Sequence, residues 1–305
     1  MKVLITGSNG FVARYLVHEY QSAGVHVVGI DMNPFPAYSM TQYYSCDLVD
    51  SAAIRAILAA ERPDVIIHLA AVSSVGRSWQ IPVEAFLNNT NIFLNLVEAI
   101  RVLNLHPRIL SIGSSEEYGN LSVSDMPLRE THQLNPCSPY AVARVAQEQL
   151  SRVYVSGYGL DIVMTRSFNQ IGPGQRPDFF VPSMVEQIRM GLERGGGIEL
   201  VTGDLSIVRD FLDVRDAVSA YRILVDRGAT GEVYNVCSGV GHSLHDVVNM
   251  LASLLGVEVS INVDRTRFRP ADNHVIIGDN TKMRLLGWSP KHDFTDTLRE
   301  LLDLR

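Results

Sequence analysis

The chain of 305 residues is 46% hydrophobic and 19% charged, which is typical of a soluble globular protein with one large or two modest domains. Its formal net charge of −7 argues against a surface for nucleic acid or anionic membranes, and no apolar run approaches the roughly 20 residues of a membrane span. The three cysteines are far apart in the sequence and predict neither a metal site nor a disulfide framework, which suits a reducing cytoplasm.

Short apolar runs alternate with amphipathic stretches through the first half of the chain. In chain order, the pattern predicts a strand at 2–5, a helix at 11–23, a strand at 25–30, a helix at 51–60, a strand at 65–69, a helix at 83–103, a strand at 108–112, a helix at 140–157 and a strand at 161–165. Buried strands separated by such helices predict an α/β fold with a doubly wound, parallel sheet of the Rossmann type.

The pattern loosens beyond Asn169, where turn signals become frequent and helices are predicted at 181–192 and 243–255. We expect this part to form a second, smaller α/β lobe, whereas the segment near 211–235 returns to the main sheet. The large domain is therefore predicted to comprise residues 1–168 and about 207–236. The small lobe is predicted to comprise about 169–206 and 237–305.

A glycine-rich loop lies between the first predicted strand and the first predicted helix. Glycines here allow a tight turn and a close approach to a pyrophosphate, whose charge is stabilised by the free N–H groups of the helix N-terminus. We assign this role to Gly7, Asn9, Gly10, Phe11 and Val12. The third glycine of the usual spacing is Ala13, which is a tolerated variant. The large domain is thus predicted to bind a dinucleotide.

Asp31 ends the second strand, 21 residues after Gly10, and can accept hydrogen bonds from an adenosine ribose. Its charge would repel a 2′-phosphate, so we expect NAD(H) in preference to NADP(H). The alternative is that Asp31 only opens the turn that follows it.

Further cofactor contacts are expected at the carboxyl ends of the next strands, where doubly wound sheets bind ligands. The candidates there are Asp47, Leu48, Leu69, Ala70 and Ala71. For His68, at the end of the same strand as Leu69, we favour a hydrogen-bonded strand histidine over a catalytic role.

Ser114 and Glu116 follow the fifth strand, and Tyr140 and Arg144 share one face of the next helix. In this arrangement the chain resembles the extended short-chain dehydrogenase/reductase family. The resemblance implies that Tyr140 moves a proton on the sugar oxygen, that Ser114 hydrogen-bonds the same oxygen, and that Asn89 matches the family asparagine. A free tyrosine ionises near pH 10, so a neighbouring cation is needed for acid–base chemistry near neutrality.

Arg144 stands where this family has lysine. Arginine keeps the positive charge and can grip ribose hydroxyls, but it is bulkier, forks differently and cannot pass a proton onward. The resemblance therefore implies a nicotinamide-dependent enzyme, with a non-catalytic protein that binds NAD or a sugar nucleotide as the alternative from another class.

Later segments resemble the nucleotide-sugar branch of the family. This resemblance implies a nucleoside-diphosphate sugar as the substrate, and we favour a GDP-linked one. Arg209 and Arg269 are the candidates to clamp its two phosphates, because a guanidinium binds such oxygens through paired hydrogen bonds. The alternative role of Arg209 is a salt bridge to Asp210 or Asp213, and the alternative for Arg269 is a solvated charge on a loop. The full set of predicted substrate contacts is Ser73, Ser114, Asn169, Val181, Arg209 and Arg269.

Within this branch the motifs are most similar to reductases that convert GDP-4-keto-6-deoxy-D-mannose to GDP-D-rhamnose by reducing C4. Ser114-Ser115-Glu116 also resembles the hydroxyl-x-Glu triplet of GDP-mannose 4,6-dehydratases, in which the Glu position removes the C5 proton. A dehydratase or C4 epimerase is therefore the alternative reaction, and a carboxylate that only hydrogen-bonds the strand end is the alternative role of Glu116. The resemblance also implies a homodimer formed through the helices at 83–103 and 140–157.

Overall fold

The computed structural model describes residues 1–195 and 197–304, so Gly196 and Arg305 of the predicted small lobe lie outside the described residues. Its largest element is a seven-stranded sheet in which every neighbouring pair of strands is parallel. In spatial order the strands are β10 (Val233–Val236), β6 (Ile162–Ser167), β5 (Arg108–Ser114), β4 (Val65–His68), β1 (Lys2–Thr6), β2 (His26–Asp31) and β3 (Gln42–Ser45).

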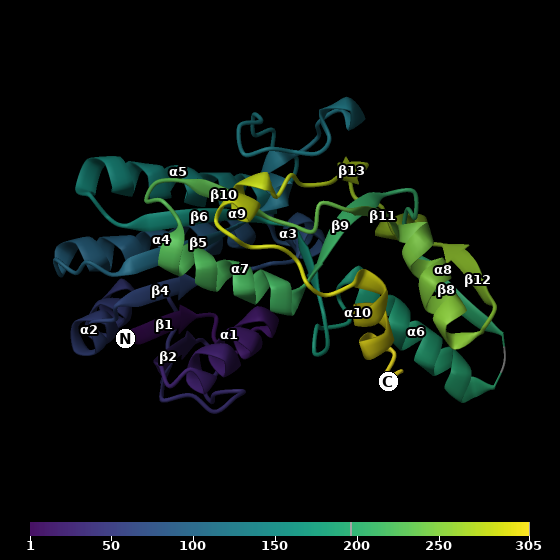
Figure 1. Cartoon of the computed structure of the whole chain (residues 1–305), viewed down its shortest axis with the longest axis horizontal. Helices are drawn as coiled ribbons and strands as arrows, with labels where there is room; N and C mark the ends of the chain where they lie inside the picture. Colours follow the sequence, from purple (N-terminus) through teal and green to yellow (C-terminus); the bar gives the residue numbers. More distant parts are fainter. Residues whose placement is uncertain (196, 305) are drawn as a thin grey trace.

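Helices cover both faces of this sheet, which confirms the predicted doubly wound Rossmann-type fold (Figure 1). One face packs against α1 (Phe11–Ser22) and α7 (Val214–Arg227). The other face packs against α2 (Ser51–Glu61), α4 (Pro82–Val102) and α5 (Pro139–Tyr158). The buried strands are apolar along most of their length because both faces are shielded from water.

The second lobe lies to one side of the sheet and has a hydrophobic core of its own (Figure 1). Strands β7 (Asn169–Ile171), β9 (Val208–Asp213), β11 (Gly241–Ser243) and β13 (Val275–Ile276) form a small mixed sheet, and β8 (Ile198–Thr202) pairs with β12 (Val259–Val263). The helices of this part are α6 (Phe180–Arg194), α8 (Leu244–Leu255) and α10 (Phe294–Leu301). Helix α9 (Thr281–Leu285) instead packs against β10 of the large sheet.

The segment that follows β9 returns to the large sheet through α7 and β10, whereas β9 itself pairs with strands of the small sheet. The residue boundaries of the two lobes stay a prediction. No helix within 1–195 and 197–304 is long and apolar enough to cross a membrane.

A short helix, α3 (Val75–Gln80), lies between β4 and α4 and contacts α4 and α5. The carboxyl ends of β1, β2, β4, β5 and β6 meet at one edge of the large sheet, where the candidate site is built.

The rigidity of this edge depends on the packing of α4 against the sheet. Phe93 on α4 is fully buried and contacts the His68 ring at a centroid distance of 5.3 Å. We expect Phe93→Ala to lower the free energy of unfolding by about 3–5 kcal/mol, because it leaves a cavity in the core. Asn91→Ala, an exposed position on the same helix, is the control and should change it by less than about 0.5 kcal/mol in urea denaturation.

Candidate active site

The glycine-rich loop forms a cradle between β1 and α1. Gly7 has a φ of +67°, and a Cβ on this residue would lie 2.9 Å from backbone atoms of Ala70, so only glycine fits. Helix α1 starts after Gly10, and its first turn carries neither a side-chain cap nor an acidic residue. The free N–H groups of this turn are therefore available to an anion such as a pyrophosphate. Phe11 and Val12 form the start of this turn.

Asp31 connects the cradle to the end of β2. Its Oδ2 accepts a hydrogen bond from the Asn9 amide at 3.1 Å, and its Oδ1 accepts from the backbone and side chain of Asn33 at 3.1 and 2.9 Å. The carboxylate thus shapes the turn after β2 and also lies beside the glycine-rich loop.

The next candidates line the same edge of the sheet. Asp47 is exposed and its Oδ1 accepts from the Val49 amide at 3.0 Å, while Leu48 is buried. Asn89 is buried on α4, and its side chain accepts from the Val72 amide at 2.7 Å and donates to the Val72 carbonyl at 3.2 Å. This double contact fixes the loop after β4, which carries Leu69, Ala70, Ala71 and the exposed Ser73.

His68 is fully buried at the end of β4, and its Nδ1 is 2.9 Å from Thr6 Oγ1. Burial, together with the smaller effect of the Arg144 charge, lowers the pKa of His68 to about 3. The imidazole therefore stays neutral near neutrality, as expected for a hydrogen-bonded strand histidine.

Arg144 is buried on α5, directly beneath Tyr140. Its guanidinium carbon lies 5.2 Å from the centre of the Tyr140 ring, a cation–π distance. The Nη1 atom donates to the Ile112 carbonyl at 3.2 Å and to Gln147 Oε1 at 2.6 Å. Gln147 in turn donates to Ser111 Oγ at 2.8 Å and to the Ile112 carbonyl at 3.1 Å. The side chains of α5 therefore hold the cation in place beside the phenol.

The Arg144 Nε is buried and has no hydrogen-bond partner among the residues that the structure describes. Within the described part of the chain, this guanidinium donates its hydrogen bonds through Nη1. The Arg144 guanidinium is thus held through Nη1, and its remaining N–H groups are available to another group.

Ser114 ends β5 and caps the 3-10 turn at Ser115–Tyr118. Its Oγ accepts from the Glu116 amide at 3.2 Å, so the hydroxyl hydrogen remains available to donate. Ser114 and Tyr140 are 8% and 6% exposed, and α5 packs against both β5 and this turn. The two predicted reacting hydroxyls therefore come from adjacent, rigid elements.

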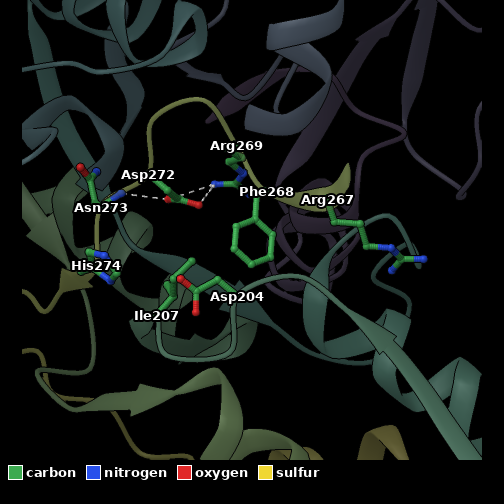
Figure 2. A pocket seen from close by; sticks show the side chains of 8 residues that line it. All are labelled: Asp204, Ile207, Arg267, Phe268, Arg269, Asp272, Asn273 and His274. Carbon is green, nitrogen blue, oxygen red and sulfur yellow. Dashed lines mark hydrogen bonds and ion pairs between the residues drawn. The ribbon is translucent and has the colours of Figure 1, made fainter. Parts of the chain in front are cut away.

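Both predicted phosphate-binding arginines pair with Asp272 at the edge of the small lobe, and Figure 2 shows Arg269 beside that carboxylate. The Arg209 Nη2 lies 2.7 Å from Asp272 Oδ1, and the Arg269 Nη1 lies 3.4 Å from Asp272 Oδ2. Arg209 is buried and also donates to the Asn273 carbonyl at 2.7 Å. Its carboxylate partner is thus Asp272, and neither Asp210 nor Asp213 forms an ion pair with it in the described residues.

Arg269 lines a pocket of about 190 Å³ together with Asp204, Ile207, Arg267, Phe268, Asp272, Asn273 and His274 (Figure 2). Its side chain is 34% exposed, so it can reach a ligand there, whereas Arg209 supports the loop from inside.

Glu116 is buried near the same arginines. Burial raises its pKa, the charges of Arg209 and Arg269 lower it, and that of Asp272 raises it again. The positive side chains of Arg209 and Arg269 and the acidic side chains of Glu116 and Asp272 thus lie close together. Two further predicted substrate contacts belong to the small lobe: Asn169 begins β7 opposite Phe211, and Val181 is buried in the lobe's core.

Comparison with known proteins assigns the chain to a family. The family model for GDP-mannose 4,6 dehydratase matches residues 4–301. The chain belongs to this family. Membership of the extended short-chain dehydrogenase/reductases, in their nucleotide-sugar branch, is thereby confirmed.

Relatives of this dehydratase family share the whole fold. The GDP-6-deoxy-D-mannose reductase of Pseudomonas aeruginosa is 32% identical over 305 residues, which cover 99% of this chain and 96% of that protein. The UDP-glucose 4-epimerase of Thermus thermophilus, solved with NAD, superposes with a TM-score of 0.89 at 28% identity and covers 100% and 98% of the two chains. The RMD protein of Pseudomonas aeruginosa, solved with NADPH, superposes with a TM-score of 0.85 at 30% identity, and the match covers 99% of this chain and 98% of that one.

Sequence reasoning missed two residues that support the site. Gln147 lies one turn after Arg144 on α5, so helical spacing could have indicated it. Asp272 is distant in sequence from Arg209, and no local pattern indicates that it joins both arginines.

The neutral, buried His68 makes a testable contribution to acid sensitivity. Its pKa is 6.5 in an unfolded chain and about 3 in the folded state. Between these two pH values the unfolded chain is protonated at His68 and the folded chain is not. Stability is therefore lost as the pH falls below 6.5, by about 2 kcal/mol on reaching pH 5.

His68→Asn keeps a polar atom near Thr6 Oγ1 and removes the titrating group. The variant's free energy of unfolding should therefore fall by about 2 kcal/mol less than that of the wild-type protein between about pH 6.5 and pH 5. Urea denaturation at both pH values measures the difference. His26→Asn, at an exposed position on β2, is the control and should retain the wild-type loss. An unchanged loss in His68→Asn would contradict the assignment.

Proposed function

We propose that this chain is a nicotinamide-dependent oxidoreductase that reduces the C4 keto group of a GDP-linked 4-keto-6-deoxyhexose, converting GDP-4-keto-6-deoxy-D-mannose to GDP-D-rhamnose. The observation that carries the proposal is the buried guanidinium of Arg144 beneath the Tyr140 ring, at the end of the strand that presents Ser114. The similarity to the Pseudomonas aeruginosa GDP-6-deoxy-D-mannose reductase over the whole chain supports this choice of reaction.

In this mechanism the cofactor supplies the hydride when bound. Tyr140 donates its proton to the carbonyl oxygen as that oxygen becomes an alkoxide, and Ser114 donates a hydrogen bond to the same atom. Arg144 supplies positive charge beside the phenol, and its remaining donors would be available to hold the cofactor ribose. The cradle at Gly7 and the uncapped start of α1 fit a pyrophosphate.

Asp31 supports NAD(H) in preference to NADP(H). Its carboxylate lies beside the cradle and can accept from the ribose hydroxyls, whereas a 2′-phosphate would be repelled by its charge. The comparison structures hold NAD in one case and NADPH in the other, so the preference is a property of this chain's own residues.

Arg269 and Arg209 support a nucleoside diphosphate as the ligand of the small lobe. Arg269 lines the pocket of about 190 Å³, and Arg209 holds Asp272 and the loop that carries Arg269. The diphosphate would compete with Asp272 for the Arg269 guanidinium and form paired hydrogen bonds with it.

The second candidate function is dehydration of GDP-mannose, which the environment of Glu116 favours. A buried carboxyl group with a raised pKa is suited to remove a proton from carbon near neutrality. A dehydratase requires such a base near C5, whereas a C4 reductase does not.

We also propose a cytoplasmic homodimer. Apolar side chains remain exposed on the two helices expected to form its interface, at Val83, Leu87, Val142 and Val153. Packing these faces of α4 and α5 against a second copy would cover them.

Two incubations separate the candidate reactions. With GDP-4-keto-6-deoxymannose and NADH, we expect loss of reduced-nicotinamide absorbance and formation of GDP-rhamnose, faster than with NADPH. With GDP-mannose and NAD⁺, we expect no 4-keto product. A 4-keto product that disappears in Glu116→Gln would instead establish the dehydratase, and binding without turnover would establish a non-catalytic protein.

In the reductase assay, Tyr140→Phe should lower kcat by about 10²- to 10⁴-fold, because it removes the proton donor. Tyr154→Phe, another buried tyrosine on α5 that bonds Glu98 away from the site, is the matched control and should keep the wild-type rate. Equal losses in both variants would contradict the role of Tyr140.

Arg144→Lys tests whether this chain is adapted to arginine. A lysine ammonium has three N–H donors against the five of the guanidinium, so with Gln147 and the Ile112 carbonyl engaged it would keep one donor where arginine keeps three. We therefore expect kcat to fall by about tenfold. Arg101→Lys, at a half-exposed position on α4, should leave kcat unchanged. A higher rate in Arg144→Lys would show that the arginine limits the enzyme.

A further inference from the structure

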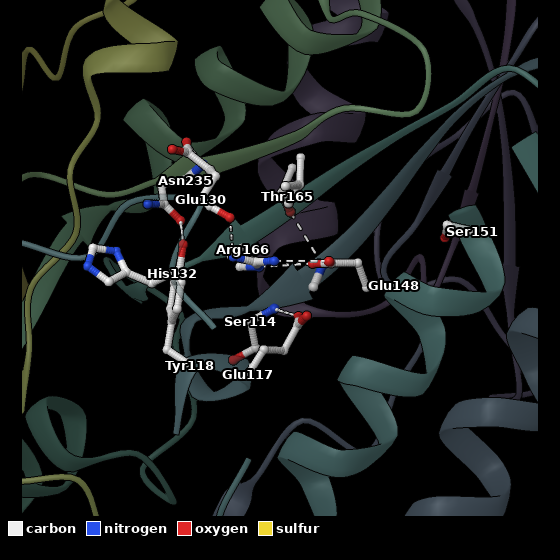
Figure 3. A network of polar contacts seen from close by, with 12 residues as sticks. Ser114, Glu117, Tyr118, Glu130, His132, Glu148, Ser151, Thr165, Arg166 and Asn235 are labelled. Atoms are coloured by element: carbon white, nitrogen blue, oxygen red, sulfur yellow. Dashed lines mark hydrogen bonds and ion pairs between the residues drawn. The ribbon is translucent and has the colours of Figure 1, made fainter. Parts of the chain in front are cut away.

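A buried network of acidic and basic side chains lies directly behind Ser114, outside the groups assigned to the reaction (Figure 3). Its members come from the turn after β5, from α5 and from β6. The sequence motifs assigned none of them a role, and the proposed mechanism does not use them. Glu117 is the member that touches Ser114.

Glu117 is fully buried, and its Oε1 accepts a hydrogen bond from the Ser114 amide at 2.7 Å. The space for this carboxyl group exists because residue 113 is glycine: a Cβ there would overlap with Glu117 Oε1. The second oxygen, Oε2, is buried and receives no N–H or O–H donor from the described residues. Glu117 therefore has one donor for two carboxyl oxygens.

Glu148 on α5 faces Glu117 and has its donors already. Arg166 on β6 donates to it through Nε and Nη2, both at 2.9 Å (Figure 3). Arg152 also donates to it, at 3.1 Å. Arg166 is itself held by the Glu130 carbonyl at 3.0 Å and by the face of the Tyr118 ring at 4.7 Å. Arg166 and Glu148 are 3% and 4% exposed, so this ion pair is complete without Glu117.

The charges decide the state of Glu117. Burial raises the pKa of Glu117 well above its usual range, and the negative charge of Glu148 raises it further, against smaller effects of the Ser114 amide and Arg166. The two carboxyl groups act on each other: Glu117 lowers the pKa of Glu148, and Glu148 raises that of Glu117. An acid proton on Glu117 satisfies its Oε2, which otherwise would face a carboxylate without a donor.

We propose that Glu117 is a positioning residue: as a neutral acid it donates to Glu148, accepts from the Ser114 amide, and so fixes the Ser114 hydroxyl. The proposal rests on the proposed function, because it gives Ser114 the role of hydrogen-bonding the substrate oxygen. Arg166 and Glu148 anchor the acid to β6 and α5. Through its hydrogen bond with the Ser114 amide, Glu117 in turn fixes the end of β5.

The consequence for catalysis is geometric. Ser114 is held by its amide to Glu117 and by its Oγ to the Glu116 amide at 3.2 Å, so both ends of the residue are tied to one turn. Losing the first contact lets the strand end shift, and a displacement of about 1 Å of a reacting group costs about 100-fold in rate.

Three variants separate this role from a general effect on folding. Glu117→Gln copies the neutral acid, since its oxygen can accept from Ser114 and its amide can donate to Glu148. Glu117→Leu fills the space and removes both contacts. Tyr118→Phe is the matched control, because it removes a buried hydroxyl that donates to Asn235 at 2.7 Å in the same network without touching Ser114.

In the reductase assay we expect Glu117→Gln and Tyr118→Phe to keep kcat within about threefold, and Glu117→Leu to lower it by about 100-fold with little change in KM. Thermal unfolding of each variant shows that it is folded at the assay temperature. An unchanged kcat in folded Glu117→Leu overturns the proposal. So does an equal loss in Glu117→Gln, because the ionised carboxylate would then be required.

Two spectroscopic readouts need no substrate. The infrared spectrum of the wild-type protein at neutral pH should contain a protonated-carboxyl band that Glu117→Gln lacks. The Ser114 amide resonance should move in Glu117→Leu and stay near its wild-type position in Glu117→Gln. Absence of the band, or an unmoved resonance in Glu117→Leu, overturns the proposal. If the wild-type protein turns over no 4-keto sugar, the proposed function is wrong, and these two readouts alone decide whether Glu117 holds Ser114.

Discussion

The buried guanidinium of Arg144 determines how the other groups at the carboxyl edge of the sheet are arranged. A charge removed from water requires partners, and α5 and β5 provide them in Gln147 and the Ile112 carbonyl. With one corner fixed in this way, the cation lies beneath Tyr140, and its field helps to keep His68 neutral at the end of β4. An arginine in the lysine position is therefore built into the surrounding structure.

The same principle recurs behind Ser114 and at the small lobe. Arg166 is paired with Glu148 behind Ser114, and Arg209 is paired with Asp272 beside the pocket. In both places a buried arginine is fully engaged with the protein and supports a neighbouring side chain that faces the site. Such pairs contribute little net stability but fix geometry, because removing one partner leaves an uncompensated charge. The polar groups of the site are thus held from behind by ion pairs.

Much of the large domain could be predicted because its signals are local. The helix expected at 11–23 is Phe11–Ser22, and the glycine-rich loop lies where a cofactor cradle should be. The strands of two or three residues, such as β13, are too short to show a period, and they exist only through pairing with β9. The acidic partners of the buried arginines could not be predicted either. Glu148 and Asp272 look like ordinary surface charges in sequence, and only long-range packing places them against Arg166 and Arg209.

A crystal structure of the protein with NAD(H) bound tests the central claim most directly. The account predicts that the nicotinamide lies beside the Tyr140 hydroxyl, while Arg144 keeps its contact with Gln147 and directs a free donor to the cofactor ribose. A pocket filled by side chains at this position, or an Arg144 head group turned away from the ribose, would contradict it.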